Sequence, residues 1–214
     1  MTKIVAIDGP AGAGKSTLAQ GVAAHLGLER LDTGAMYRAV AWYALAHGID
    51  VGDAEAVAEM AGRLHIEVGE RVTVDGDDVT AAIRSAAVDG AVSAVAANPA
   101  VRATLVEQQR RWMKERGAGV MEGRDIGTVV LPDADLKVYL TAGTGERARR
   151  RATERRDGRS TAEVESDLAR RDRLDSTRSH SPLVRPQDVA DDAVVIDSTG
   201  KSADEVLEEV LRCL

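Results

Sequence analysis

The feature that most constrains this chain of 214 residues is an apolar strand followed by a glycine-rich loop and a helix. Lys3–Asp8 has the short apolar run of a buried strand, and Lys15–Leu26 has the apolar spacing of a helix that ends at Gly27. Between them lies the sequence GPAGAGKS, which fits the pattern G-x-x-x-x-G-K-[ST] in the strand-to-helix context that this pattern requires. The arrangement predicts a loop that holds an anion against the N-terminus of a helix.

The residue types of this loop fit the phosphates of a nucleoside triphosphate. Its glycines let several backbone N–H groups point inward. Lys15 is expected to reach the β- and γ-phosphates, and the Ser16 hydroxyl is expected to bind Mg²⁺. We therefore expect ATP as the phosphate donor with Mg²⁺, rather than a turn that only joins a strand to a helix. The residues expected to bind ATP are Gly9, Pro10, Ala11, Gly12, Ala13, Gly14, Lys15, Ser16 and Thr17.

Further apolar strands alternate with helices, which predicts an α/β fold with a parallel sheet covered on both faces, the three-layer core of a P-loop NTPase. The further strands are expected at Leu28–Asp32, Gly119–Met121, Leu136–Leu140 and Val194–Ile196. The further helices are expected at Ala35–His47, Ala54–Leu64, Ala87–Ala97, Val101–Arg116, Glu146–Arg156, Thr161–Arg173 and Ser202–Leu214.

Two appendages interrupt this alternation within what we interpret as a single domain, residues 1–214. The first covers residues 32–97 and contains a small antiparallel insert around residues 65–85, with strands at Ile66–Val68 and Arg71–Asp75. The second covers residues 147–173 and consists of two charged helices.

Composition narrows the class of ligand. A net charge of −7 is unsuited to binding a nucleic-acid backbone, and an aromatic content of 2% leaves few rings on which bases could stack. Of the 28 basic residues only five are lysines, and the arginine side chain binds phosphate groups through a planar pair of donors. These features favour small anions over nucleic acid.

Cysteine usage and hydropathy bear on the compartment. The single cysteine, Cys213, excludes an internal disulfide, as is usual in a reducing cytosol. No apolar run has the length of a membrane-spanning helix. We expect a cytoplasmic monomer that binds neither membrane nor nucleic acid.

Segments outside the loop indicate what happens to the triphosphate. The Asn-Lys-x-Asp segment with which a GTP switch reads guanine is absent. Instead, the strand Gly119–Met121 leads into Glu122-Gly123-Arg124-Asp125, and an arginine beside a carboxylate at this edge of a sheet suits ligand recognition. Glu122 either reaches Mg²⁺ through water or accepts local N–H bonds. Transfer to a phosphate acceptor is favoured, because that acceptor is already deprotonated and needs positioning and charge neutralisation rather than a general base.

Four segments in order, AIDGPAGAGKST, LDTGAMYRA, EGRDIGTVVLPDADLKVYL and RRDRLDSTRSHSPL, resemble the bacterial cytidylate kinases, a family of nucleoside monophosphate kinases. The similarity runs from Lys3 to the C-terminus. It implies transfer of the γ-phosphate of ATP to CMP or dCMP with Mg²⁺, on a core that carries a region binding the nucleoside monophosphate (32–97) and a lid (147–173). The antiparallel insert after His65 resembles an extra segment of the bacterial members.

The resemblance also implies the residues of the acceptor site. Thr33 takes the position of a hydroxyl that faces the pyrimidine, where many relatives have serine. The residues implied in CMP binding are Thr33, Arg38, Ser93, Arg102, Arg124, Asp125, Arg171, Asp175 and Arg178. The residues implied in catalysis are Lys15, Arg124 and Arg150, the last of which lies in the lid, where Arg147 and Arg151 are secondary candidates.

Several of these residues also have a purely structural interpretation. Arg38 and Arg102 would then face water, and Ser93 would be a small packing residue in an alanine-rich helix. The pairs Arg124–Asp125 and Asp175–Arg178 would be local ion pairs, the second at the i, i+3 spacing of a helix surface.

Two other functions remain open at this point. One is a P-loop kinase of another small acceptor, such as UMP, AMP or a metabolite hydroxyl. A hydroxyl acceptor would need a general base, and the sequence offers no good one. The other is a non-catalytic ATP-binding switch, which the density of arginines around a second anion site disfavours.

Overall fold

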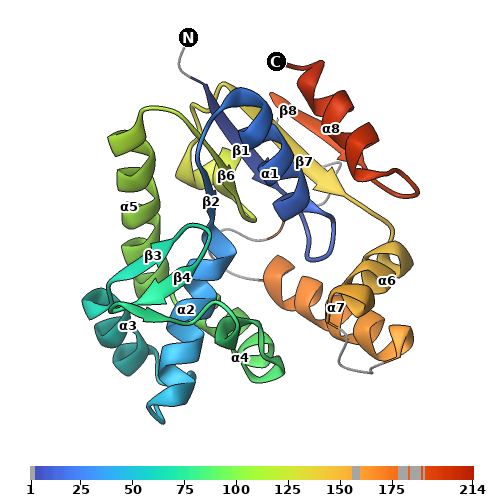
Figure 1. Cartoon of the computed structure of the whole chain (residues 1–214). Coiled ribbons are helices and arrows are strands. Elements are labelled where there is room, and N and C mark those ends of the chain that lie inside the picture. Colours follow the sequence, from blue (N-terminus) through green and yellow to red (C-terminus); the bar gives the residue numbers. More distant parts are fainter. Residues whose placement is uncertain (1–2, 156–159, 178–182, 184–188, 190) are drawn as a thin grey trace. The chain divides into compact units, whose positions relative to one another are not determined.

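The computed structural model describes residues 3–155, 160–177, 183, 189 and 191–214 (Figure 1). The chain divides into two compact units, one made of Met1–Arg30 with Gly117–Leu214, the other of Leu31–Arg116. The expected residue Arg178 lies outside the described residues.

A five-stranded sheet has the strand order β2-β6-β1-β7-β8, and its strands other than β2 lie wholly in the first unit. Strand β1 pairs in parallel with β6 and with β7, and β7 pairs in parallel with β8. The expected α/β fold with a parallel sheet is therefore confirmed. The strands are β1 (Ile4–Asp8), β2 (Arg30–Asp32), β6 (Gly119–Glu122), β7 (Leu136–Thr141) and β8 (Ala193–Asp197).

Helices α1 (Lys15–Leu26) and α8 (Ala203–Leu211) pack together on this sheet. Helix α1 begins after Gly14 and ends at Gly27, and both glycines have left-handed backbone conformations that other residues adopt only with strain. The apolar side chains of the two helices and of the three inner strands form one buried cluster, which includes Val5, Ile7, Leu18, Val22, Val138, Leu140, Val206 and Val210. This cluster fixes the end of β1 and the start of α1, and so the loop between them.

Helices α6 (Thr144–Arg155) and α7 (Thr161–Ser176) form a pair in the same unit. A small buried cluster joins Ala148 of α6 to Val164 and Leu168 of α7, and it also includes Ala11 of the glycine-rich loop. Helix α7 begins with a capping box in which the Ser160 hydroxyl accepts the amide of Glu163 and the Glu163 carboxylate accepts the amide of Ser160. This pair corresponds to the segment expected to form the lid.

The second unit is mainly helical. Its helices are α2 (Thr33–Ala46), α3 (Ala54–Arg63), the short η1 (Ala82–Arg84), α4 (Ala86–Ala97) and α5 (Pro99–Arg116). The expected antiparallel insert is present as a three-stranded sheet in the order β3-β4-β5. Its strands are β3 (Ile66–Val68), β4 (Val72–Val74) and β5 (Asp77–Asp78).

One element that local sequence patterns did not predict is η2, a π-helical segment at Ile126–Val130 that follows β6. Its hydrogen bonds span five residues: the amide of Val130 donates to the Asp125 carbonyl at 3.2 Å, and that of Leu131 to the Ile126 carbonyl at 2.7 Å. The run IGTVV has no helical apolar spacing, so contacts from elsewhere in the chain must hold it. The strand β5 and the helix η1 were also not predicted.

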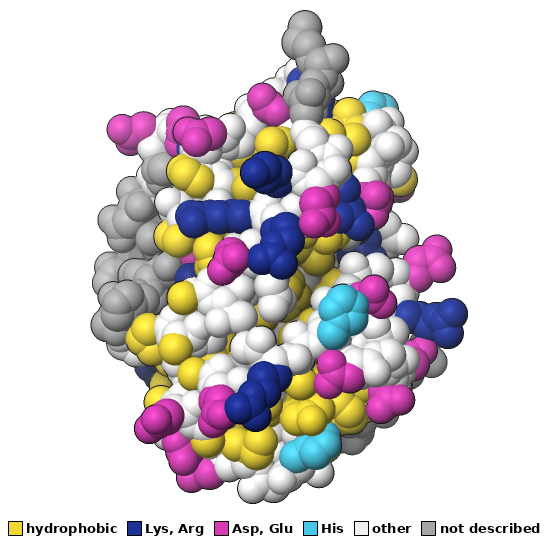
Figure 2. Space-filling model, turned by 90° about the vertical axis from the view of Figure 1, so that its left-hand side faces the viewer, with side chains coloured by type: hydrophobic (Ala, Val, Ile, Leu, Met, Phe, Trp, Pro, Cys, Tyr) yellow, Lys and Arg dark blue, Asp and Glu magenta, His cyan; other side chains and the backbone are white. Residues whose placement is uncertain are grey.

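The surface carries charges of both signs. On the face shown in Figure 2, acidic and basic side chains are interspersed. In the described part of the chain, no helix is both long enough and apolar enough to cross a membrane.

Candidate active site

The glycine-rich loop between β1 and α1 has the backbone shape that its sequence predicts. Gly9, Gly12 and Gly14 all have positive φ angles, of 144°, 77° and 98°. At Gly9 a Cβ atom would lie 2.0 Å from the carbonyl oxygen of Leu140, a backbone atom of β7 that cannot move aside. The loop is therefore pressed against the sheet, with the N-terminus of α1 directly behind it, which is the arrangement of a phosphate-binding loop.

The two side chains expected to act on the donor phosphates both sit in the first turn of α1. Lys15 is buried, and its Nζ donates to the Pro10 carbonyl at 2.9 Å, so the ammonium group lies over the loop itself. The Ser16 hydroxyl donates to Oε2 of Glu122, at the end of β6, at 3.0 Å. In the register of the sheet, Glu122 stands opposite Ile7, one residue before the end of β1.

The pairing of Ser16 with Glu122 bears on Mg²⁺. A hydroxyl and a carboxylate are the oxygen donors that Mg²⁺ prefers, so these residues fit the ion. Among the described residues, no group of three or more His, Cys, Asp or Glu side chains is arranged to hold a metal.

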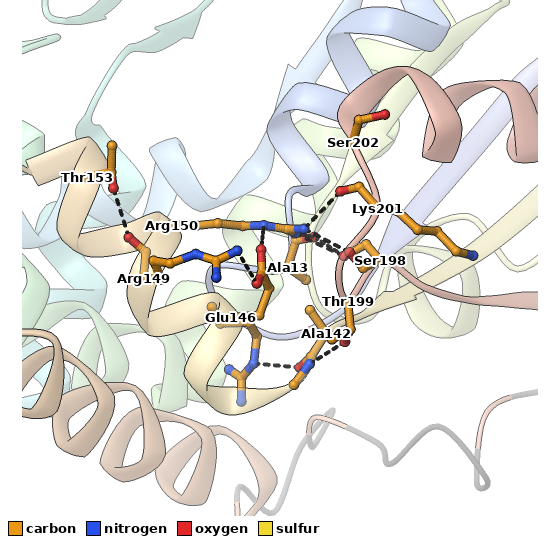
Figure 3. A network of polar contacts seen from close by, with 12 residues as sticks. Ala13, Ala142, Glu146, Arg149, Arg150, Thr153, Ser198, Thr199, Lys201 and Ser202 are labelled. Carbon is orange, nitrogen blue, oxygen red and sulfur yellow. Dashed lines mark hydrogen bonds and ion pairs between the residues drawn. The ribbon is translucent and has the colours of Figure 1, made fainter.

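Beside the loop lies a cavity of about 360 Å³. It is lined by Gly14 and Thr17 at the start of α1, by Arg150 and Thr153 of α6, and by Lys201 in the segment that joins β8 to α8. Figure 3 shows Arg150 reaching from α6 towards Ala13 and the β8–α8 segment. The cavity thus lies beside the phosphate loop, between α6 and the β8–α8 segment of the same unit.

The guanidinium group of Arg150 forms one wall of this cavity. Nη1 donates to the Ala13 carbonyl at 3.2 Å and to the Ser198 hydroxyl at 3.0 Å. Nη2 donates to the carbonyls of Ser198 and Lys201, at 2.8 and 3.4 Å, and Nε donates to Glu146 at 2.9 Å. Arg150 therefore connects α6, the phosphate loop and the β8–α8 segment.

Arg147, a secondary candidate from the sequence, has a structural place. It is buried, and it donates to the carbonyls of Ala142 and Ala11, both at 3.1 Å. It also forms an ion pair with Asp172 of α7 at 2.7 Å. These contacts hold α6 and α7 together against the phosphate loop.

The residues expected to bind CMP that belong to the first unit lie after β6 and on α7. Nε of Arg124 donates to Oδ2 of Asp175 at 3.3 Å, and Nε of Arg171 lies 4.0 Å from the same oxygen. The Asp175 side chain is 1% exposed. Asp125 is also buried, and its carbonyl accepts hydrogen bonds that begin η2. The structure thus pairs Arg124 with a carboxylate 51 residues away, a contact that the sequence did not predict.

The expected CMP-binding residues of the second unit are all buried there. Thr33 begins α2, Ser93 lies on α4, and both are less than 10% exposed. Arg38 donates to the Ile83 carbonyl at 3.0 Å and forms an ion pair with Asp89.

Arg102 belongs to the same buried set. It lies on α5 and donates to the Tyr37 hydroxyl at 3.4 Å. Neither Arg38 nor Arg102 is a solvated surface arginine, so that interpretation is wrong for both. A buried guanidinium group must have charged or polar partners, and such groups often serve a ligand.

Two functional candidates were missed by sequence reasoning. Asp89 partners Arg38, and the only local signal for it was an acidic residue in an otherwise alanine- and valine-rich helix. Asp8 ends β1 directly before the phosphate loop, is buried, and accepts backbone hydrogen bonds from Ile126 and Gly127. Burial raises the pKa of Asp8 to about 6, against the opposing effect of these hydrogen bonds; the nearby Asp125 carboxylate raises it further and Lys15 lowers it.

Comparisons with known proteins give the family. The cytidylate kinase family profile matches residues 5–214. The cytidylate kinase of Symbiobacterium thermophilum is 50% identical over 98% of this chain and 94% of that protein. A bifunctional pantoate ligase/cytidylate kinase of Nostoc sp. is also 50% identical, over 97% of this chain; the chain spans only 40% of the length of that relative.

Solved structures agree on the fold. A gluconokinase from Sinorhizobium meliloti superposes with a TM-score of 0.53 and 13% identity, covering 99% of this chain and 90% of that one. At this identity the likeness concerns the fold alone. The family match and the sequence relatives, by contrast, span nearly the whole chain, and the chain belongs to the cytidylate kinase family.

Proposed function

We propose that this protein transfers the γ-phosphate of ATP to CMP or dCMP, giving ADP and CDP or dCDP. The observation that carries this proposal is a phosphate loop with Lys15 and Ser16 in place, in a chain that is 50% identical to a relative named cytidylate kinase over 98% of its length. The likeness to a solved kinase structure concerns the fold and does not identify the acceptor.

On the donor side, the loop amides and Lys15 would bind the phosphates of ATP. The cavity beside Gly14 and Arg150 is open to the same loop, and we propose that it receives the adenosine part. Mg²⁺, held by Ser16 with Glu122 behind it, would neutralise charge on the phosphate oxygens. Lys15 would hold the γ-phosphate in line, and the low exposure of this ammonium group strengthens its attraction for developing negative charge.

On the acceptor side, we propose that Arg38 and Arg124 bind the phosphate of CMP. Thr33, Ser93, Arg102 and Asp125 would recognise the base, and Arg171 and Asp175 the ribose. Each of the arginines is held by a partner in its own unit, for instance Arg38 by Asp89 and Arg124 by Asp175. Pre-positioned cations of this kind suit a reaction that must bring two polyanions together.

We further propose a cytoplasmic monomer, since both substrates are cytoplasmic nucleotides. Leu45, Leu174 and Val195 are the large apolar side chains exposed among the described residues, and they come from α2, α7 and β8. Size-exclusion chromatography with light scattering measures the mass directly.

An acceptor panel tests the proposed activity. ADP release is followed with CMP, dCMP, UMP and AMP at equal concentrations and with no acceptor. CMP and dCMP should stimulate release far above the background without acceptor. A preference for UMP or AMP would instead identify a kinase of another nucleotide, and binding of ATP without any acceptor-dependent turnover would identify a switch.

A further inference from the structure

Asp8 makes a contact that the proposed reaction does not by itself require. It ends β1, and the residue is 7% exposed. Oδ1 accepts the amide of Ile126 at 2.7 Å, and Oδ2 accepts the amide of Gly127 at 2.8 Å. Both carboxylate oxygens are thus directed at the first turn of η2, which lies 118 residues further along the chain.

This contact has an energetic cost, so it needs a reason. Taking a carboxylate out of water is unfavourable unless hydrogen bonds compensate for the lost hydration. Here burial outweighs the two amide bonds and raises the pKa of Asp8 to about 6. An apolar residue at the end of β1 would avoid the cost of burying a charge, but it would leave the amides of Ile126 and Gly127 without this acceptor.

The position of η2 suggests the reason. The segment begins directly after Arg124 and Asp125, so an anchor on Ile126 and Gly127 fixes the backbone from which those two side chains emerge. The other end of the same anchor is the residue before Gly9, where the phosphate loop begins. A single carboxylate therefore joins the base of the donor loop to the base of the Arg124–Asp125 segment.

The contacts around η2 come from its own backbone, from β7 and from Asp8. Its later amides, those of Val129, Val130 and Leu131, bond within a π-helical turn, a conformation that is rare. At Gly127 a Cβ atom would lie 3.1 Å from the side chain of Lys137, so the backbone is close to β7 on that side. The Asp8 carboxylate accepts the amides of the first two residues of this turn.

We propose that Asp8 is a positioning residue, which holds the Arg124–Asp125 segment in the conformation that recognises the acceptor nucleotide. This inference rests on the proposed function, because it assigns Arg124 and Asp125 to CMP. It predicts that Asp8 acts mainly on the acceptor, although it lies next to the donor loop in sequence. A carboxylate that only supported the fold of the phosphate loop would act on ATP instead.

The test compares Asp8→Asn with the wild type in steady-state kinetics, with CMP and ATP varied separately. Asparagine keeps the size but offers one acceptor oxygen in place of two. Asp135→Asn is the matched control, since Asp135 accepts the Ile4 amide at 2.7 Å at the opposite end of the same strand. We expect KM for CMP to rise about ten-fold in Asp8→Asn and KM for ATP to change by less than about two-fold, with neither changed in the control.

Two further measurements keep the outcome interpretable. Amide hydrogen exchange should be faster at Ile126 and Gly127 in Asp8→Asn, and unchanged there in the control. Asp8→Asn should raise KM for CMP by a smaller factor when it is added to Arg124→Ala than when it is made in the wild type, because Arg124 is already lost in the double variant.

An equal rise in KM for ATP and CMP, or no change in either, would overturn the inference. Unchanged exchange at Ile126 and Gly127 would overturn it as well. If the wild-type protein shows no CMP-dependent turnover, the proposed function fails. The exchange measurement then still decides whether Asp8 holds η2.

Discussion

Nε of Arg124, two residues after the end of β6, lies 3.3 Å from Oδ2 of Asp175 on α7. The carboxylate is almost fully buried and the arginine is 18% exposed, so the pair presents a cation at the surface and keeps its counter-charge beneath. Arg171 approaches the same carboxylate from one helical turn away. An arginine held in this way loses little side-chain freedom when it binds a phosphate.

Removal of Arg124 tests its role at the acceptor. Arg124→Ala should raise KM for CMP by about 30-fold or more and change KM for ATP little, because a charge-assisted contact to phosphate contributes about 2–3 kcal/mol. Arg124→Lys should recover only part of the loss, since lysine cannot form the same paired contacts. Equal effects on the two substrates would argue against an acceptor role.

The partner carboxylate gives a separate prediction. Asp175→Asn should lower the free energy of unfolding by about 1–3 kcal/mol, because it weakens a hydrogen bond between a buried carboxylate and an arginine. Urea denaturation measures this value. A variant as stable as the wild type would show that the pair contributes nothing to the fold.

Lys15 carries the prediction for catalysis. Lys15→Ala should reduce kcat by about 10³-fold, because a buried cation at the transferring phosphate would be lost. Binding of CMP, measured by calorimetry, should remain. Lys114→Ala is a suitable control, since Lys114 lies on α5 and is exposed. Residual turnover within about ten-fold of the wild type would contradict the assigned role.

Two arginines of the α6–α7 pair test the wall of the donor cavity. Arg150 donates to three backbone carbonyls, whereas Arg170 on α7 is 56% exposed, pairs with Asp167 one helical turn before it and does not line the cavity. Arg150→Ala should therefore weaken ATP binding by about ten-fold or more and reduce transfer, while Arg170→Ala should change either by less than about two-fold. Equal effects of the two substitutions would refute a specific role for Arg150.

The raised pKa of Asp8 predicts how stability depends on pH. Its ordinary value is 3.8 and its value in the folded protein is about 6, so the folded state binds this proton more tightly than the unfolded state. The stabilisation from that proton is complete below the ordinary value and is lost as the pH rises through 6. Relative to Asp8→Asn, the wild type should therefore gain about 1.4 kcal/mol between pH 7.5 and pH 5.0.

Urea denaturation of both proteins at these two pH values measures the difference. The comparison removes the contributions of the other titrating groups, which the two proteins share. A stability difference that is the same at both pH values would contradict the pKa shift.

The parts of the fold that could be predicted are those specified by neighbouring residues. The bounds of α1 follow from apolar spacing between Gly14 and Gly27, and the antiparallel insert follows from short alternating runs between turns. The segment η2 could not be predicted in this way. Its sequence has no periodic signal. The side chain that accepts its first amides is that of Asp8, which lies 118 residues earlier in the sequence.

The same distinction applies to the candidate site. Lys15 and Ser16 are contained in one contiguous motif, so their placement against the loop follows from local sequence. Burial of Arg38 depends on Asp89, and burial of Asp175 depends on Arg124, each 51 residues apart. No local pattern encodes such pairs, which is why sequence reasoning left a surface arginine and a surface ion pair open as alternatives.

The most direct test of the central claim is to identify the product. Purified protein is incubated with ATP, CMP and Mg²⁺, and the nucleotides are separated by ion-exchange chromatography over time. The proposed function predicts that CDP and ADP appear in equal amounts, and that neither forms when CMP is omitted. Formation of ADP without CDP, or no reaction with CMP while another acceptor is phosphorylated, would contradict it.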